Sequence, residues 1–532
     1  MESAGDDVAG GPAYGVVMSE RFDVTIVGGG HNALVAATYL ARAGLSTVVL
    51  ERLPHVGGAA ISARAFDGVD ARLSRYAYLV SLFPEALIEE LGLNLELLSR
   101  ATASYTPYGD DGLLAQTQEG EATRESFRTL TGTDADYESW QAFYAEVATV
   151  ARAIAPTLLK PLPHIGDVRD QVEMAIWTDL VDEPLGRAIE RRFSNDVVRG
   201  LVATDALIGT FASMHDESLV QNRCFLYHLI GNGTGEWRVP VGGMGAVTGE
   251  LERVAREAGA ELRTNVEVTG IQVHGSGVTV SGDGLAIDSD RLLSGVAPYV
   301  LACLLGEHPP KKPRGAQLKI NLLVDRLPRL KSGIDPAIAF AGTLHIDESY
   351  DELEAAHAEA TVGKLPTKMA GEIYCHTLSD PSILSTELRA SGAQTLTYFG
   401  LHTPPEVFDH PAAKGEAVRR ALAGLDNYLV DPIESVLATD AAGNPCIEAK
   451  SPLDVEAALG MPGGHIFHGD LSWPWLEEGE RPHTSAASWG VSTHHERILM
   501  CGSGARRGGA VSGIAGHNAA HAVLDFLGPQ SG

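Results

Sequence analysis

The sequence predicts an α/β fold, and three patterns near its N-terminus carry that prediction. Residues 22–28 form a short apolar run that ends in glycine, which is typical of a buried parallel strand. Residues 32–43 are apolar on most sides and are followed by Gly44, which indicates a buried helix that stops at glycine. Residues 46–51 form a second apolar run, which completes a βαβ unit.

Length and composition predict a protein of two or more domains. At 532 residues the chain is too long for a single hydrophobic core. The hydrophobic fraction of 44% and the charged fraction of 20% are ordinary for a globular enzyme. A net charge of -29 argues against a nucleic-acid partner and against electrostatic docking on an anionic membrane. The net charge does not exclude peripheral contact with a membrane, nor does it exclude the formation of a homo-oligomer.

Cysteine usage and the N-terminus predict a cytoplasmic protein. The five cysteines include no CxxC pair, which excludes a dithiol redox motif and a cysteine-based zinc site. No stretch has the length of a membrane span. The first twenty residues include Glu2, Asp6 and Asp7 but no lysine or arginine, unlike a signal or transit peptide. We expect residues 1–20 to be a disordered tail.

The first glycine motif, Gly28-x-Gly30-x-x-Ala33, is typical of a dinucleotide-binding turn. Gly28 permits a tight turn, Gly30 leaves room for a pyrophosphate, and Ala33 is small enough for helix–strand packing. Glu51 stands 21 residues after Gly30, where a carboxylate binds ribose hydroxyls. We expect His31 and Asn32 to cap the start of the helix. The alternative is a glycine-rich turn in an unrelated α/β protein.

A second glycine pair, Gly57-Gly58, favours FAD as the dinucleotide. Flavoproteins use such a pair to bring the backbone close to the cofactor, whereas a simple nicotinamide dehydrogenase does not need it. A surface loop is the alternative. No second βαβ fingerprint follows, so bound NAD(P)H is not expected.

The C-terminal segment "CGSGARRGGAVSGIAGHNAA" predicts a strand, a glycine-rich loop and a helix that begins near Val511. A helix N-terminus at this point would stabilise negative charge on a reduced flavin. Arg506 and Arg507 either add positive charge to the flavin site or are merely solvated.

Three segments together resemble the phytoene desaturase-like flavoproteins of the amine oxidase and desaturase superfamily. They are "VGGGHNALVAATYLARAGLSTVVLERLPHVGGAA", "VPVGGMGAVTGELERVAREAGAELRTNVEVTGI" and "ILMCGSGARRGGAVSGIAGHNAA". The resemblance is greatest to the branch named after human pyridine nucleotide-disulfide oxidoreductase domain-containing protein 2. It runs from about residue 20 to residue 528, and it is specific in the FAD segments and looser in the helical middle.

The resemblance implies a discontinuous Rossmann-like FAD-binding domain and a mixed α+β substrate domain that covers the flavin. The FAD-binding domain would comprise residues 21–100, 235–300 and 490–528. The substrate domain would comprise residues 101–234, which are mainly helical, and residues 301–489.

The resemblance also assigns site residues. Gly28, Gly30 and Ala33 match the pyrophosphate turn; Glu51 matches the ribose ligand, with Arg52 beside the adenosine; Gly57, Gly58 and Ala59 match the flavin-side loop; Val268 matches the residue whose backbone meets adenine; Gly502, Val511 and Ser512 match the flavin-edge segment. Ala59 is a departure, because many relatives carry arginine there. The centre of the C-terminal segment has no cysteine, which predicts non-covalent FAD.

Two residues are candidates for catalysis. Lys319 lies on a predicted strand and matches a lysine that related amine oxidases hold near the flavin through water; the alternative is a lysine at a strand edge. His468 is a candidate proton acceptor, and the alternative is a hydrogen-bonded structural histidine. His494 and His495 lack further metal-ligand spacing, so no metal site is predicted.

The leading functional hypothesis is an FAD-dependent oxidoreductase that desaturates or isomerises a largely apolar or polyene-like small molecule. Its flavin would be reoxidised by O2 or a quinone. One alternative is an amine or amino-acid oxidase, which needs an aromatic pair at the flavin and a carboxylate or arginine for the substrate. The other is a non-catalytic escort-type binding protein. The intact glycine motifs argue against the loss of FAD.

Overall fold

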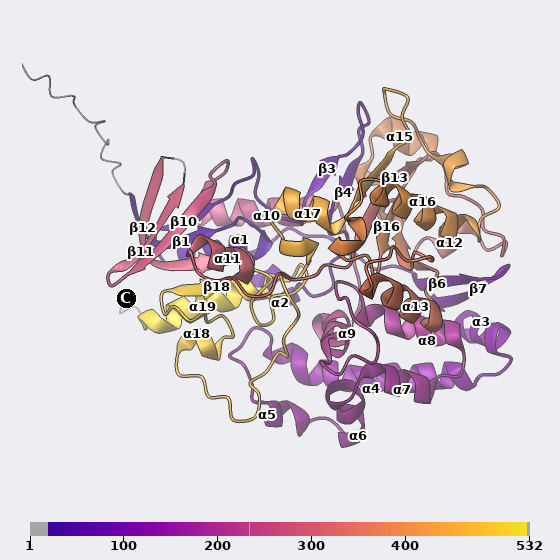
Figure 1. Ribbon diagram of the computed structural model, residues 1–532, viewed down its shortest axis with the longest axis horizontal. Helices are drawn as coiled ribbons and strands as arrows, with labels where there is room; N and C mark the ends of the chain where they lie inside the picture. The colour runs from indigo at the N-terminus through magenta and orange to yellow at the C-terminus, as the bar shows by residue number, and fades with distance from the viewer. Residues whose placement is uncertain (1–19, 234, 283, 529–532) are drawn as a thin grey trace, which may run out of the picture.

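The computed structural model describes residues 20–233, 235–282 and 284–528. The expected tail lies outside these residues except for Glu20, which is a correction because Glu20 begins the first strand. The described residues form two seven-stranded sheets with helices around them, and two short antiparallel pairs of strands (Figure 1). The predicted α/β class is therefore confirmed.

The first sheet takes its strands from the beginning, the centre and the end of the chain. Their order is β10 (Val268–His274), β11 (Gly277–Gly282), β12 (Leu285–Ser294), β1 (Glu20–Val27), β2 (Thr47–Leu50) and β9 (Glu261–Arg263), and β18 (Ile498–Met500) pairs with β12. The pairings of β1 with β12 and β2, of β2 with β9, and of β12 with β18 are parallel. This largely parallel arrangement forms the Rossmann-like part of the fold, and the ends of β1 and β12 and all of β2 and β18 are its buried strands.

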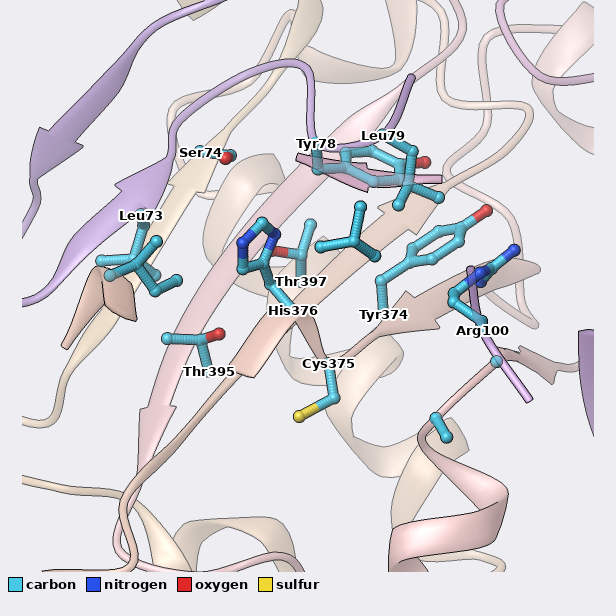
Figure 2. Close-up of a pocket in the computed structure, with 14 residues that line it drawn as sticks. Leu73, Ser74, Tyr78, Leu79, Arg100, Tyr374, Cys375, His376, Thr395 and Thr397 are labelled. Atoms are coloured by element: carbon cyan, nitrogen blue, oxygen red, sulfur yellow. The ribbon is translucent and has the colours of Figure 1, made fainter. Parts of the chain in front are cut away.

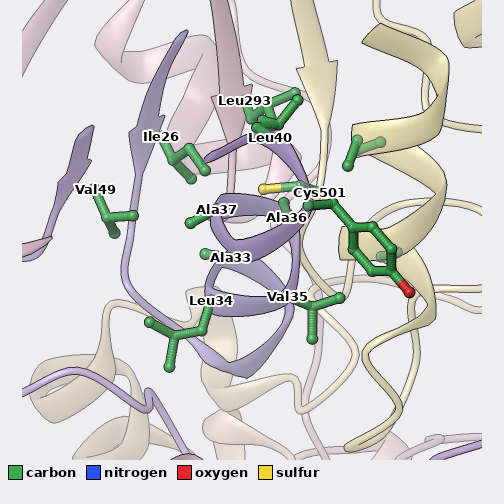
Figure 3. Packing of buried hydrophobic residues seen from close by; sticks show 14 of the residues in the cluster. Ile26, Ala33, Leu34, Val35, Ala36, Ala37, Leu40, Val49, Leu293 and Cys501 are labelled. Atoms are coloured by element: carbon green, nitrogen blue, oxygen red, sulfur yellow. The ribbon is translucent and has the colours of Figure 1, made fainter. Parts of the chain in front are cut away.

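Helix α1 (His31–Arg42) connects β1 to β2 and lies at the centre of this region. It packs against α10 (Met244–Glu257) and α19 (Ile514–Leu527). Figure 3 shows the small side chains of Ala33, Ala36 and Ala37 on this helix, between the strands and the C-terminal helix. Small side chains allow such close packing on several sides, because they leave little volume between the backbones.

The second sheet is almost entirely antiparallel. Its order is β17 (Ile447–Lys450), β13 (Leu318–Val324), β16 (Gln394–Gly400), β15 (Gly371–Tyr374), β14 (Thr343–Ile346), β6 (Thr102–Tyr108) and β7 (Asp111–Gln116). Only the β14–β6 pairing is parallel. The shorter pairings join β3 (Ser62–Arg64) to β4 (Arg72–Ser74) and β5 (Leu97–Leu98) to β8 (Val239–Pro240).

A helical layer lies beside the second sheet (Figure 1). It contains α3 (Glu121–Thr131), α4 (Ala135–Ile154), α7 (Leu185–Arg192), α8 (Asp196–Ala203) and α9 (Val220–Ile230). Buried aromatic residues, among them Phe143, Phe193 and Phe225, form its core. The remaining α-helices are α2 (Glu85–Leu91), α5 (Ile165–Arg169), α6 (Met174–Trp177), α11 (Pro298–Leu304), α12 (Pro336–Ala339), α13 (Tyr350–Thr361), α14 (His376–Ser379), α15 (Thr386–Ser391), α16 (Ala413–Asp426), α17 (Pro452–Leu459) and α18 (Ser485–Ser488).

Within the described part of the chain, none of the helices combines the length and the apolar character that a membrane span requires.

Candidate functional site

The turn between β1 and α1 leaves space beside Gly30. A Cβ atom placed on Gly30 meets no atom within 4 Å. Gly30 is the N-cap of α1, with φ -69°, and no side chain caps the helix. The expected capping by His31 and Asn32 is therefore wrong, since the His31 ring contacts the Ala510 carbonyl at 3.2 Å instead. The first backbone N–H groups of α1 remain available for an anion.

Glu51 is fixed at the end of β2, facing this turn. Its side chain is buried, and one carboxylate oxygen accepts a hydrogen bond from the Gly29 N–H at 2.8 Å. The other oxygen accepts from the Leu53 N–H at 2.8 Å. A carboxylate has about four acceptor positions, so lone pairs remain for ribose hydroxyls.

The glycine pair Gly57-Gly58 packs directly on the turn. The Gly57 N–H donates to the Gly29 carbonyl at 2.8 Å, and Gly57 is buried. Both glycines have positive φ, +114° and +59°, and a Cβ on Gly58 would lie 3.2 Å from the Gly30 Cα. The surface-loop alternative is therefore wrong, because the pair forms part of the same site as the turn.

The C-terminal glycine segment, residues 502–513, approaches the same place from the other side. Gly502 follows β18, and its N–H donates to the Ser294 carbonyl at 3.1 Å. Val511 and Ser512 are buried, and the Ser512 hydroxyl accepts from the Ile514 N–H at 3.3 Å. Helix α19 begins at Ile514 rather than near Val511, which corrects the predicted helix start.

Arg506 and Arg507 hold this segment in place, so the expectation that they are merely solvated is wrong. The Arg507 guanidinium is 1% exposed and donates to the carbonyls of residues 157, 158, 160 and 474. Arg506 donates to the Trp475 carbonyl at 2.9 Å and pairs with Glu480 at 3.1 Å. Both side chains therefore connect the glycine segment to distant loops.

The other predicted cofactor residues lie around the turn. Ala33 is buried in α1, and the Ala59 carbonyl accepts from the Ala77 N–H at 3.2 Å. Val268 begins β10, two residues after Val266, whose N–H donates to the Glu51 carbonyl at 2.9 Å. Arg52 donates to the Ala458 carbonyl at 2.8 Å, at the end of α17, so its role beside the adenosine stays a prediction.

Lys319 lies in the interior of the second sheet. Its strand, β13, pairs with both β16 and β17, so the strand-edge alternative is wrong. The Lys319 amine donates to the carbonyls of Ser74 at 2.8 Å and Tyr76 at 2.6 Å. It also lies 4.9 Å from the centre of the Tyr78 ring. Burial lowers the pKa of Lys319 well below its ordinary value.

His468 lies near the C-terminal glycine segment. A Cβ on Gly504 would lie 3.5 Å from the His468 Cβ. Burial, with His465 and His31 nearby, lowers the pKa of His468 to about 4. Its Nδ1 has no hydrogen-bond partner among the described residues, so the alternative of a hydrogen-bonded structural histidine is not supported at this atom. The ring is therefore neutral at physiological pH, and its role as a proton acceptor stays a prediction.

A small cavity lies beside the Ala59–Ala77 contact, because Tyr78, the residue after Ala77, lines it. Leu73, Ser74, Tyr78, Arg100, Tyr374 and His376 contribute to its wall. Figure 2 shows the Tyr374 ring beside the Arg100 guanidinium, below Tyr78 and Leu79. The Tyr78 and Tyr374 ring centroids are 4.4 Å apart.

A larger cavity of about 340 Å³ shares Arg100 and Tyr374 with the small one. It lies between the second sheet and helices α4, α8 and α9, and its aromatic lining includes Trp140, Tyr144 and Trp237. Burial, with neighbouring carboxyls, raises the pKa of Asp205 to about 8 and that of Glu372 to about 7. No motif in the sequence marks these lining residues as members of a site.

Comparison with known proteins identifies the family of the chain. Residues 26–86 match the NAD(P)-binding Rossmann-like domain, and residues 86–329 match the flavin containing amine oxidoreductase family. An uncharacterised protein of Mycobacterium tuberculosis is 50% identical over 523 residues, which cover 95% of this chain and 97% of that protein. The chain belongs to the superfamily of flavin-containing amine oxidoreductases.

Two further relatives fit this membership. Mouse pyridine nucleotide-disulfide oxidoreductase domain-containing protein 2 is 28% identical over 570 residues, covering 96% of this chain and 94% of that protein. A putrescine oxidase mutant of known structure has the same fold, with a TM-score of 0.59 and 17% identity over 96% of this chain and 99% of that one. The predicted superfamily is therefore confirmed: the protein is an FAD-dependent oxidoreductase of this group.

The cofactor of this flavoprotein is FAD. The residues around the turn between β1 and α1 fit that cofactor. The open space at Gly30 suits a pyrophosphate, and Glu51 suits a ribose. The Asn32 Oδ1 atom, at the start of α1, is buried and has no hydrogen-bond partner among the described residues. Such an atom is expected beside a bound polar group.

We expect Gly30→Ala to weaken FAD binding strongly while leaving the fold intact. The φ of -69° suits alanine, and the added methyl occupies the open space that the pyrophosphate needs. The dissociation constant for FAD, measured by fluorescence titration of the apoprotein, should rise on the order of 100-fold. Gly249→Ala on α10 also adds a methyl to open space and should bind FAD normally. Full flavin content in Gly30→Ala would contradict this placement of the pyrophosphate.

Proposed function

We propose that this flavoprotein oxidises a small molecule that carries a basic nitrogen, by removing hydride from the carbon next to that nitrogen. The observation that supports this most strongly is the set of carboxyl groups in the larger cavity. Four of its lining residues bear carboxyl groups, namely Glu119, Asp205, Glu236 and Glu372, whereas Arg100 is the arginine among them. The raised pKa values of Asp205 and Glu372 mean that a cationic ligand would be needed to keep these two groups ionised, and a protonated amine supplies that charge together with N–H donors.

The size of the cavity supports a small substrate. A volume of about 340 Å³ is near the lower end of the range for small-molecule sites. Aromatic side chains at Trp140, Tyr144 and Trp237 supply apolar surface around the polar groups. These features favour the amine-oxidase alternative over the polyene desaturation that the sequence first indicated.

The protein side chains position the reactants. When bound, FAD supplies the hydride acceptor. Lys319 fixes the backbone of Ser74 and Tyr76 by donating to their carbonyls. It thereby also fixes the wall of the small cavity at Tyr78, whose ring it contacts. In this proposal His468, which lies near the C-terminal glycine segment and is neutral at physiological pH, would accept a proton only transiently, because burial lowers its pKa to about 4.

Desaturation or isomerisation of an apolar molecule, with O2 or a quinone as electron acceptor, is the second candidate. The observation in its favour is the apolar part of the larger cavity, where Val147, Leu201, Ile208 and Leu229 contribute to the wall.

An anaerobic bleaching experiment separates the two. We expect primary amines to bleach the flavin absorbance of the purified protein, and the product imine to hydrolyse to a carbonyl compound and ammonia. Matched alcohols and hydrocarbons of equal length are the controls. Bleaching by polyenes or steroids, without ammonia, would support the second candidate instead. A protein that contains FAD but is bleached by neither class would favour the escort-type alternative.

A further inference from the structure

Three side chains of metal-ligating type meet at the wall of the larger cavity. They belong to His345, Glu348 and Glu372, and one ligand atom of each lies within 4.8 Å of the others. Their exposed fractions are 3%, 1% and 1%, so the group is buried. His345 and Glu372 line the cavity itself. The proposed oxidation does not require these three residues to act as a group.

Strand register and a strained residue bring the three together. His345 on β14 and Glu372 on β15 are direct cross-strand partners, which places their side chains on one face of the sheet. The chain then turns at Asp347, whose φ of +53° is uncommon for a residue other than glycine. This turn returns Glu348 to His345, with 2.6 Å between its Oε2 and the His345 Nδ1.

One carboxylate oxygen of Glu348 lacks a well-formed hydrogen bond among the described residues, although the Thr204 hydroxyl lies near this carboxyl. Glu348 Oε1 is buried and has no hydrogen-bond partner among the described residues. Buried polar atoms are almost always paired, and an exception indicates a bound water or ion. Two carboxyl groups side by side away from solvent need either a positive charge nearby or a shared proton, and the test below separates the two.

The partners of Glu372 resemble those that orient metal ligands. Its Oε1 accepts a hydrogen bond from the Thr204 hydroxyl at 3.1 Å, and its Oε2 accepts from the Tyr374 hydroxyl. Outer hydrogen bonds of this kind fix a ligating carboxylate in one orientation.

We propose that His345, Glu348 and Glu372 bind one divalent transition-metal ion, with its open coordination positions facing the larger cavity. An imidazole and two carboxylates, without a thiolate, suit Zn²⁺ or Mn²⁺. Bonds of about 2.0–2.2 Å separate neighbouring ligand atoms by roughly 3 Å, so small side-chain movements suffice. The ion binds water or a lone pair of the molecule in the cavity, while Glu119 and Asp205 still face that molecule.

A second group of possible metal ligands lies nearer the surface, and it must be prevented from binding the ion during the test. His494 and His495 both contact Glu307, at 3.1 Å and 2.8 Å, which the sequence spacing did not reveal. His494 is 68% exposed at its side chain, and each member already has a partner in the cluster. All measurements therefore use the Glu307→Gln background, so that an ion bound at the surface is not counted.

The test is calorimetric titration of chelator-treated, FAD-loaded protein with zinc chloride and, separately, manganese chloride. One ion per chain should bind, and Glu348→Gln and His345→Gln should each weaken binding by about 10–100-fold. Glu119→Gln, a matched change at another wall of the cavity, should bind the ion normally. The melting temperature should rise with the metal in the background protein and not in Glu348→Gln.

Two results would overturn the proposal. One is the absence of saturable binding in the Glu307→Gln background. The other is unchanged affinity in both cluster variants, which would mean that the carboxyls share protons instead. If one cluster variant does not fold, the other variant and the melting temperature of the background protein still decide the outcome.

Discussion

Replacement of Arg507 by methionine is expected to destabilise the protein by roughly 4 kcal/mol or more and to reduce its flavin content. The guanidinium is 1% exposed and donates to the carbonyls of Thr157, Leu158, Lys160 and Pro474. The carbonyls of Lys160 and Pro474 would lose this donor at a cost of about 1–3 kcal/mol each. The Thr157 carbonyl keeps the Lys160 N–H as a donor, and the Leu158 carbonyl keeps the Asn518 amide. Because Arg507 lies within the C-terminal glycine segment, the loss should also disorder the flavin-edge residues.

Urea unfolding of the apoprotein measures this effect without the contribution of bound FAD. Arg506→Met is the matched control, since the Arg506 side chain is 25% exposed and donates to a single carbonyl besides its contact with Glu480. We expect its loss of unfolding free energy to be about 1–2 kcal/mol. Equal losses in the two variants would mean that the buried carbonyls near Arg507 find other donors.

The cofactor turn was predictable because its parts are close in sequence. Gly28, Gly30 and Glu51 belong to one βαβ unit, in which strand, turn and helix fix one another locally. The glycine pair follows within a few residues, so its contact with the turn is also local. Sequence reasoning failed at His31, because the ring contacts Ala510, 479 residues away, and does not cap its own helix.

The cavity residues were not predictable, because they depend on long-range register. His345 and Glu372 are partners only because β14 and β15 pair in one register, and a shift by one residue would place them on opposite faces. Lys319 carried a local strand signal, yet its hydrogen-bond acceptor Ser74 lies 245 residues away. Asp205 follows a helix and has no motif around it. Chemistry of this kind becomes visible only after the two sheets and the helical layer are assembled.

A distant contact is also the basis of the last prediction. It concerns Gly516, a glycine of the C-terminal segment to which the sequence assigned no role. Gly516→Ala should destabilise the protein by about 3 kcal/mol or more and weaken FAD binding. A Cβ on Gly516 would lie 1.9 Å from the Asn32 carbonyl oxygen and 2.8 Å from its carbon. These are backbone atoms of α1, so the helix must move as a unit, and it begins at the pyrophosphate turn.

Gly415→Ala on α16 is the control, because its added methyl meets no atom within 4 Å. That change should stabilise the protein by about 0.5–1 kcal/mol, as expected for glycine to alanine within a helix. Chemical unfolding and flavin titration of both variants measure the difference. If Gly516→Ala has the same free energy of unfolding and the same affinity for FAD as the parent protein, then α1 and α19 can move apart without an energetic cost. If it behaves as expected, the close contact at Gly516 sets the distance between the N-terminal turn and the C-terminal glycine segment, and FAD requires both.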